Sequence, residues 1–149
     1  MKATPARGGG AVPRISTWVP QALVAGALYL LIGRWFPNPA ENARVWRLGA
    51  WGASALVFVA HIGFERFRLR SAPFSLALHT ASAVALGGLG LAIVGMANTF
   101  SRQPELRLNW LLALVIWPAV TALPAFLVAL AAGKILERAG AERPGGGNR

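Results

Sequence analysis

The two histidines of this chain are the side chains best suited to chemistry. His61 and His79 lie on either side of a short arginine-rich turn, and each is embedded in an apolar run. A neutral imidazole in such surroundings can ligate a metal, relay a proton, or simply hydrogen-bond a neighbouring helix. Any chemistry of the chain is therefore expected between residues 61 and 79.

The most specific of these possibilities is a tetrapyrrole. If the turn joins two membrane helices, both histidines sit roughly 6–8 Å inside the same boundary, at a rise of about 1.5 Å per residue. Helical spacing places small residues on their faces, such as Ala53 with His61 and Gly87 with His79. His61 and His79 could then ligate haem b or chlorophyll axially.

Plainer interpretations of the histidines stay open beside this one. Each ring could hydrogen-bond a backbone carbonyl, interfacial water or one of the hydroxyls nearby, which belong to Ser54, Ser75, Thr80 and Ser82. His61 and Glu65, four residues apart on one helical face, could instead relay a proton or form a weak metal site. The flanking motifs and further ligands typical of haem-binding families are not found.

The elements that must position these residues are indicated by composition. Of the 149 residues 55% are hydrophobic and only 13% are charged, about half the charged share of a soluble domain. The apolar residues form long uncharged blocks, which a bilayer requires and a soluble core does not. There is no cysteine, so disulfides and thiolate metal sites are excluded.

Four of these blocks are long enough to cross a bilayer. The predicted fold class is therefore all-α: a polytopic membrane protein with four transmembrane helices in an up-down bundle joined by short loops. The helical domain covers 15–138, with spans at about 15–35, 47–65, 74–97 and 108–134. On this assignment Glu65 marks the end of the second span and no acidic residue falls within its uncharged part or within the other spans, which argues against a carboxylate-based pump.

The two ends of the chain are expected to be disordered. Residues 1–14 and 139–149 are rich in Gly, Pro and Arg and have almost nothing to bury. A basic start followed by an apolar run also resembles a secretory signal peptide. The run exceeds the usual h-region of about 7–15 residues and no A-x-A site follows it, so a retained span is the preferred interpretation.

Orientation follows from the basic residues. Most of the fifteen lie in the two tails and in the middle turn, where Arg66, Arg68 and Arg70 are clustered. The positive-inside rule then predicts an inner (cytoplasmic) membrane protein with both termini in the cytoplasm. The three arginines are expected to anchor this topology and to bind anionic lipid or an acidic partner subunit. No basic amphipathic helix is present, so nucleic acid is not an expected partner.

Two further patterns concern helix packing. The third span carries small residues at the spacing of close helix contacts, and these are Ala83, Gly87, Gly88, Gly90, Ala92 and Gly95. In the fourth span Pro118 and Pro124 are expected to kink the helix, either as a static bend or as a hinge. Thr121, three residues from each, could bond a carbonyl that they expose.

The motifs that the sequence contains and those that it lacks limit the function that can be expected. No metalloprotease, nucleophile-elbow or phosphate-loop motif is present, and no catalytic residue or metal site is predicted. The preferred hypothesis is a non-catalytic accessory or structural subunit that packs against a larger membrane complex or self-associates. The alternatives are a tetrapyrrole-binding subunit of an electron-transfer or photosynthetic complex through His61 and His79, and a small transporter or channel subunit.

Overall fold

The computed structural model of the chain describes residues 18–35, 40–100 and 107–141, and these form an all-helical structure. Its elements, in order, are α1 (Trp18–Trp35), a 3₁₀ turn η1 (Ala40–Asn42), α2 (Ala43–Phe67), α3 (Pro73–Phe100) and α4 (Arg107–Ala141).

Three of the described helices are long and apolar enough to cross a membrane. These candidate spans are Ala43–Phe67 in α2, Pro73–Asn98 in α3 and Leu111–Gly140 in α4. Helix α1 is not among them: it has only 18 residues and includes Gln21 and Arg34. A membrane protein with several spans is therefore supported, whereas the predicted span at 15–35, and with it the four-span bundle, stays a prediction.

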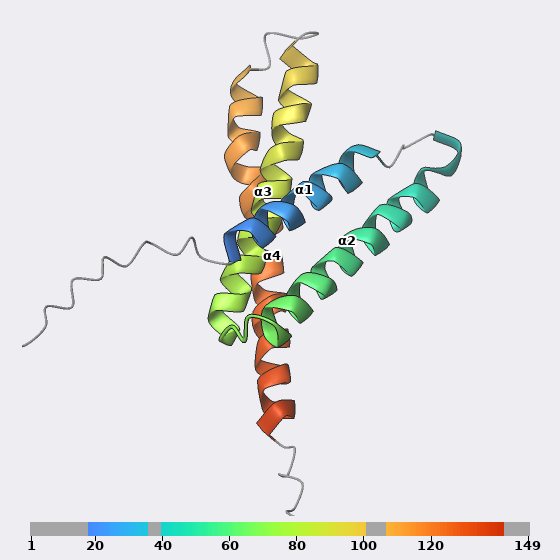
Figure 1. Ribbon diagram of the computed structural model, residues 1–149. Coiled ribbons are helices and arrows are strands. Elements are labelled where there is room, and N and C mark those ends of the chain that lie inside the picture. Colours follow the sequence, from blue (N-terminus) through green and yellow to red (C-terminus); the bar gives the residue numbers. More distant parts are fainter. Residues whose placement is uncertain (1–17, 36–39, 101–106, 142–149) are drawn as a thin grey trace, which may run out of the picture.

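The helices are arranged as two antiparallel pairs. In Figure 1, α3 and α4 stand side by side, while α1 and α2 form a hairpin that leans across them. The interface between α3 and α4 is the most extensive in the structure, and that between α1 and α3 is second. Helix α2 touches α3 and α4 much less, so the molecule is a tight three-helix unit with α2 attached at its side.

Helix α2 extends further than the sequence predicted. It continues to Phe67, two residues beyond the expected end of the span at 65, and the amide of Arg68 caps it by donating to the carbonyl of Phe64. Glu65 therefore lies inside a candidate span, not at the start of the turn. The expectation that no acidic residue falls within a span is wrong for this helix and also for α4, whose candidate span contains Glu137.

The chain reverses between α2 and α3 within five residues. Arg70 takes a left-handed backbone conformation with φ of 52°, which turns the chain at the cost that an L side chain carries there. Pro73 then opens α3, where its missing amide hydrogen is not needed.

Two small buried clusters hold the helices together. One joins α2, α3 and α4 beside the turn and is centred on Ile62, Leu76, Ala77 and Ala129. The other joins α1 to α3 through Ala22, Ala25 and Ala83. Most of the remaining large apolar side chains are exposed on the helix faces, as expected for surfaces that meet lipid or other helices.

The predicted tails lie mostly outside the described residues. Residues 1–14 are not described, and of 139–149 only the first three are, as the last turn of α4, which ends at Ala141. Helix α4 is also longer than its predicted span, since it begins at Arg107 and continues past residue 134.

Candidate functional site

A buried carboxylate holds the ends of α2 and α3 together. The side chain of Glu65 is fully buried, with 0% of its surface exposed. Both of its carboxylate oxygens lie 3.2 Å from Nδ1 of His79 on α3. The hydroxyl of Ser71, in the turn between the two helices, donates to Oε2 at 2.6 Å. These three residues are called the Glu65 cluster below.

The main chain of the turn reinforces this arrangement. The amide of Ser71 donates to the carbonyl of Glu65 at 3.1 Å, so Ser71 contacts Glu65 through both backbone and side chain. Because an ionised carboxylate only accepts hydrogen bonds, it requires the proton of His79 to be on Nδ1. Helix positions and turn geometry thus fix the orientation of this imidazole.

The aromatic ring of Trp18 covers one face of His79. The two rings are stacked, with centroids 4.4 Å apart and an angle of 4° between their planes. Trp18 begins α1, so this contact links the first helix to the Glu65 cluster. An indole face excludes water and stabilises a cationic imidazole when the histidine is protonated.

His61 lies in very different surroundings, although it is one helical turn from Glu65. It is 4% exposed, and neither ring nitrogen has a hydrogen-bond partner among the described residues. The open cavity that it lines lies between α1 and α2, and His79 is not among the residues that line it. The structure therefore joins His79 to Glu65, whereas no described residue makes a hydrogen bond to His61.

This arrangement adds no observation in favour of His61 and His79 as cofactor ligands. A tetrapyrrole on His61 and His79, whether shared or separate, stays a prediction. Within the three described ranges no group of three or more His, Asp or Glu side chains is positioned to hold a metal ion.

The arginines of the turn differ from one another in position. Arg66 is partly buried beside the end of α4, where its guanidinium would lie 3.9 Å from a Cβ added to Gly140. Arg68 and Arg70 are exposed. Their predicted role in binding lipid or a partner stays a prediction.

The small residues of α3 lie where neighbouring helices come close. A Cβ added to Gly87 would be 2.5 Å from the Cβ of Tyr29 on α1, and one added to Gly88 would be 2.8 Å from Oγ1 of Thr121 on α4. Gly90 meets Leu30 of α1 in the same way at 3.2 Å. Ala83 and Ala92 are buried, and Gly95 is partly buried. Larger side chains at the first two positions would force the helices apart.

Pro118 and Pro124 both lie inside α4, which continues through them as one helix. The hydroxyl of Thr121 donates to the carbonyls of Trp117 and Pro118, each at 3.0 Å. The carbonyls that lose their helical donor to proline are those of Leu114 and Val120. Thr121 therefore bonds the backbone beside the prolines and does not replace the missing bonds.

Sequence reasoning missed the pairing of Glu65 with His79. The signal was present, because His61 and Glu65 share a helical face and His79 was expected at matching depth on the next helix. Placing Glu65 at the beginning of the turn concealed it. The stacking of Trp18 has no sequence signal, since it depends on how α1 crosses α3.

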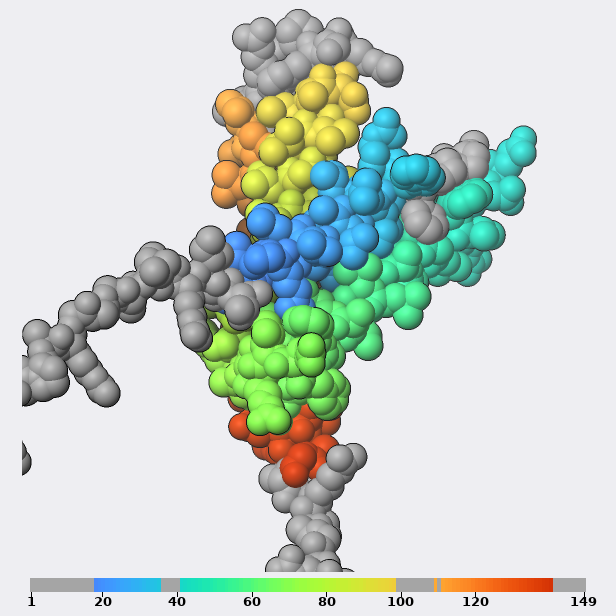
Figure 2. Space-filling view, viewed as in Figure 1, coloured from blue at the N-terminus to red at the C-terminus, as the bar shows by residue number. Residues whose placement is uncertain are grey.

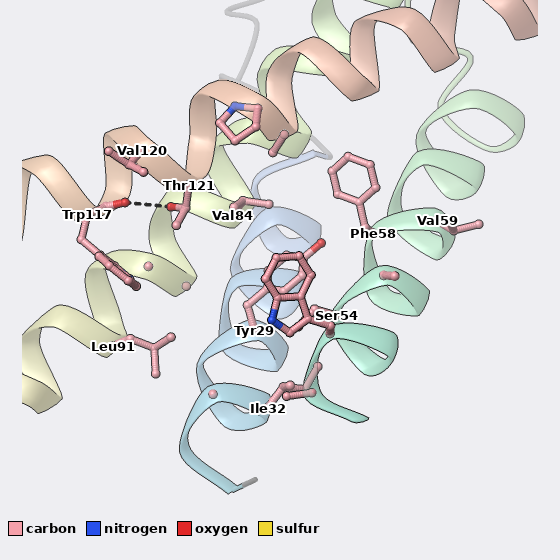
Figure 3. Close-up of a pocket in the computed structure, with 18 residues that line it drawn as sticks. Tyr29, Ile32, Ser54, Phe58, Val59, Val84, Leu91, Trp117, Val120 and Thr121 are labelled. Atoms are coloured by element: carbon pink, nitrogen blue, oxygen red, sulfur yellow. Dashed lines mark hydrogen bonds between the residues drawn. The ribbon is translucent and has the colours of Figure 1, made fainter. Parts of the chain in front are cut away.

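A larger cavity opens between the two helix pairs. It has a volume of about 640 Å³ and is lined by all four helices. Figure 3 shows Tyr29 and Ile32 of α1, Phe58 of α2, and Trp117 and Thr121 of α4 around it. This space is called the inter-pair cavity below.

In comparisons with known proteins, no protein-family model, curated protein or solved structure matches this chain.

Proposed function

We propose that the protein is a non-catalytic accessory subunit that packs against a larger membrane protein through the inter-pair cavity. The observation that carries this proposal is the cavity itself. A chain whose helices are otherwise in contact leaves about 640 Å³ open between α2 and the remaining helices. The space-filling view shows α2 diverging from the column formed by α3 and α4 (Figure 2).

The lining of the cavity favours a helix as its occupant. Small side chains come from every wall, including Gly33, Ala55, Gly88 and Ala125. Small residues let membrane helices approach closely, and dispersion contacts then drive their association because lipid tails are as apolar as the helices.

Polar groups in the cavity also favour a protein partner. The hydroxyl of Tyr29 is buried without a hydrogen-bond partner among the described residues, and Ser54 of α2 lines the same cavity. Acyl chains cannot satisfy a hydroxyl, whereas a helix carrying a polar side chain can.

Filling the cavity from within tests this proposal. Ala55 lines it and is exposed, so Ala55→Trp places an indole in the space without crowding a packed interface. A tagged full-length chain is purified in mild detergent from its native membranes. Wild type should retain a membrane protein at fixed stoichiometry, and Ala55→Trp should retain at least about tenfold less.

Ala119→Trp on α4 is the matched control, because Ala119 is exposed and does not line the inter-pair cavity. Both variants should unfold within about 0.5 kcal/mol of wild type. Equal co-purification of the two variants contradicts the proposal. Recovery of only a second copy of this chain, or of lipid alone, also contradicts it.

The topology proposed with this function has four spans and both termini in the cytoplasm of an inner-membrane protein. The support is the excess of basic residues in the tails and the middle turn, together with the close packing of α1 against α3. Reporters fused to the two termini should both be read from the cytoplasm. If α1 does not cross, the three remaining spans leave the termini on opposite sides.

A further inference from the structure

A second cavity lies within the α1–α2 hairpin and contains the unpartnered His61. Its volume is about 390 Å³, and all of its walls come from these two helices. It shares no residue with the inter-pair cavity. It is called the His61 cavity below.

The polar groups of the His61 cavity lie at one end. His61 is in the last two turns of α2, and Gln21 is in the first turn of α1. Because α1 and α2 run antiparallel (Figure 1), these residues are close to the same level. Leu28 and Leu56 line the part of the cavity towards the middle of the hairpin. The two polar residues thus lie at the end of the cavity near the turn between α2 and α3, with their unpaired atoms just beneath its surface, and the cavity is apolar deeper along the helices.

Both polar groups lack partners. The two ring nitrogens of His61 and the carboxamide oxygen of Gln21 are buried without a hydrogen bond to any described residue. A buried polar atom left unpaired costs about 1–3 kcal/mol. A neutral imidazole supplies one donor and one acceptor, and the carboxamide oxygen supplies a further acceptor.

We propose that the His61 cavity binds a neutral amphiphile whose head carries hydroxyl groups, such as a quinol or a lipid alcohol. A hydroxyl both donates and accepts, so it can pair with the imidazole and with the carboxamide oxygen. The apolar tail of the ligand lies along Leu28 and Leu56. Phe64, which lines the polar end, offers a face for a ring-shaped head.

The size and access of the cavity fit this ligand class. A volume of 390 Å³ is within the range of small-molecule sites. Val24 and Leu56 on its walls are exposed, so an amphiphile can enter sideways from the lipid. The ring nitrogens of His61 and the carboxamide oxygen of Gln21 are themselves covered, and binding therefore requires both side chains to rotate about their broad terminal torsions.

The test uses the full-length chain in lipid nanodiscs with two probes, decylhydroquinone and dioctanoylglycerol. Saturable binding of one probe per chain is expected for at least one of them. Decylhydroquinone identifies a quinol site, and dioctanoylglycerol identifies a lipid-alcohol site. The dimethoxy analogue of decylhydroquinone, which cannot donate a hydrogen bond, should bind at least about tenfold more weakly than the hydroquinone if that probe binds.

Two variants remove the polar groups. His61→Phe keeps a planar ring but no nitrogen, and Gln21→Leu removes the carboxamide. Each should lower the affinity about tenfold, while Ser54→Ala in the inter-pair cavity should leave it unchanged. Because both removed groups are unpaired, neither variant should be less stable than wild type in the absence of probe.

Three results overturn the proposal. They are the absence of saturable binding by both probes, equal probe binding by wild type and His61→Phe, and, if decylhydroquinone binds, equal binding of its dimethoxy analogue. A clear loss of stability in ligand-free His61→Phe also contradicts it, since that result means that the imidazole already has a partner in the protein.

Discussion

The two sides of this molecule are held together by different physical means. On one side, α3 packs closely against α1 and α4 through glycine and alanine. On the other, α2 is buried mainly at its C-terminal end, through His61, Ile62 and Glu65. Most of α2 before residue 61 is exposed or only partly buried.

The space around the glycines shows how closely the helices pack on each side. Added Cβ atoms on Gly26 and Gly87 would lie 2.9 and 2.5 Å from side-chain carbons of the facing helix. Around Gly52 and Gly63 of α2, no described atom of another element lies within 4 Å of such a Cβ. Glycine is therefore a packing residue in α1 and α3 and a conformational cost in α2.

The comparison shows how a helix with few small interfacial residues can still be attached. Apolar contact alone gives little preference for a helix over lipid, so association depends on close approach or on polar contacts. The tight side uses close approach. Helix α2 uses a buried carboxylate at its C-terminal end, where Glu65 joins it to His79 of α3.

The largest expected effect comes from breaking the polar attachment. Glu65→Ala leaves the partly buried imidazole of His79 and the hydroxyl of Ser71 without their acceptor. The free energy of unfolding should fall by about 3 kcal/mol. SDS-driven unfolding from dodecyl maltoside micelles measures this change.

The exposed Glu41 of η1 provides the control. Glu41→Ala should change the stability by less than about 0.5 kcal/mol. Replacing the pair together, as Glu65→Leu with His79→Phe, should restore most of the loss because the imidazole is then not left without its buried carboxylate partner. Equal stabilities for Glu65→Ala and Glu41→Ala mean that the cluster does not hold α2.

A smaller effect is expected on the close-packed side. Gly87→Val places new carbon atoms against Tyr29 and should destabilise the fold by about 2 kcal/mol, the usual cost of overpacking. Gly52→Val makes the same change on α2 in open space and should raise stability by a few tenths of a kcal/mol, roughly the difference in helix propensity. The same unfolding assay compares them. A similar loss for both variants refutes the contrast between the two sides.

The smallest effect concerns the turn that joins α2 to α3. Arg70→Gly relieves a left-handed backbone conformation and should stabilise the fold by about 1 kcal/mol or less. Arg68→Gly removes an equal charge where φ is −95°, a conformation that arginine adopts freely, and should be neutral or slightly destabilising. Thermal unfolding in detergent compares the two, and identical shifts mean that charge, not backbone conformation, controls the turn.

Parts of this architecture were readable from the sequence. Long uncharged blocks predicted helices, and the arginine-rich turn before Pro73 predicted the reversal between α2 and α3. The length of an uncharged block gives the spacing between charged residues, however, and does not show where the backbone hydrogen bonds of a helix end. The helix end at Phe67 therefore escaped prediction, as did the burial of Glu65.

The sequence by itself determined that the chain is helical, that it has several segments apolar enough for a membrane, and where the basic residues gather. These properties follow from local composition, because a bilayer requires each segment to satisfy its own backbone hydrogen bonds. Only the tertiary structure decided that His79 pairs with Glu65, that no described residue pairs with the ring nitrogens of His61, and that α2 meets α4 only beside the turn. Those outcomes depend on how helices cross, and a crossing is determined by contacts between side chains that are distant in the sequence.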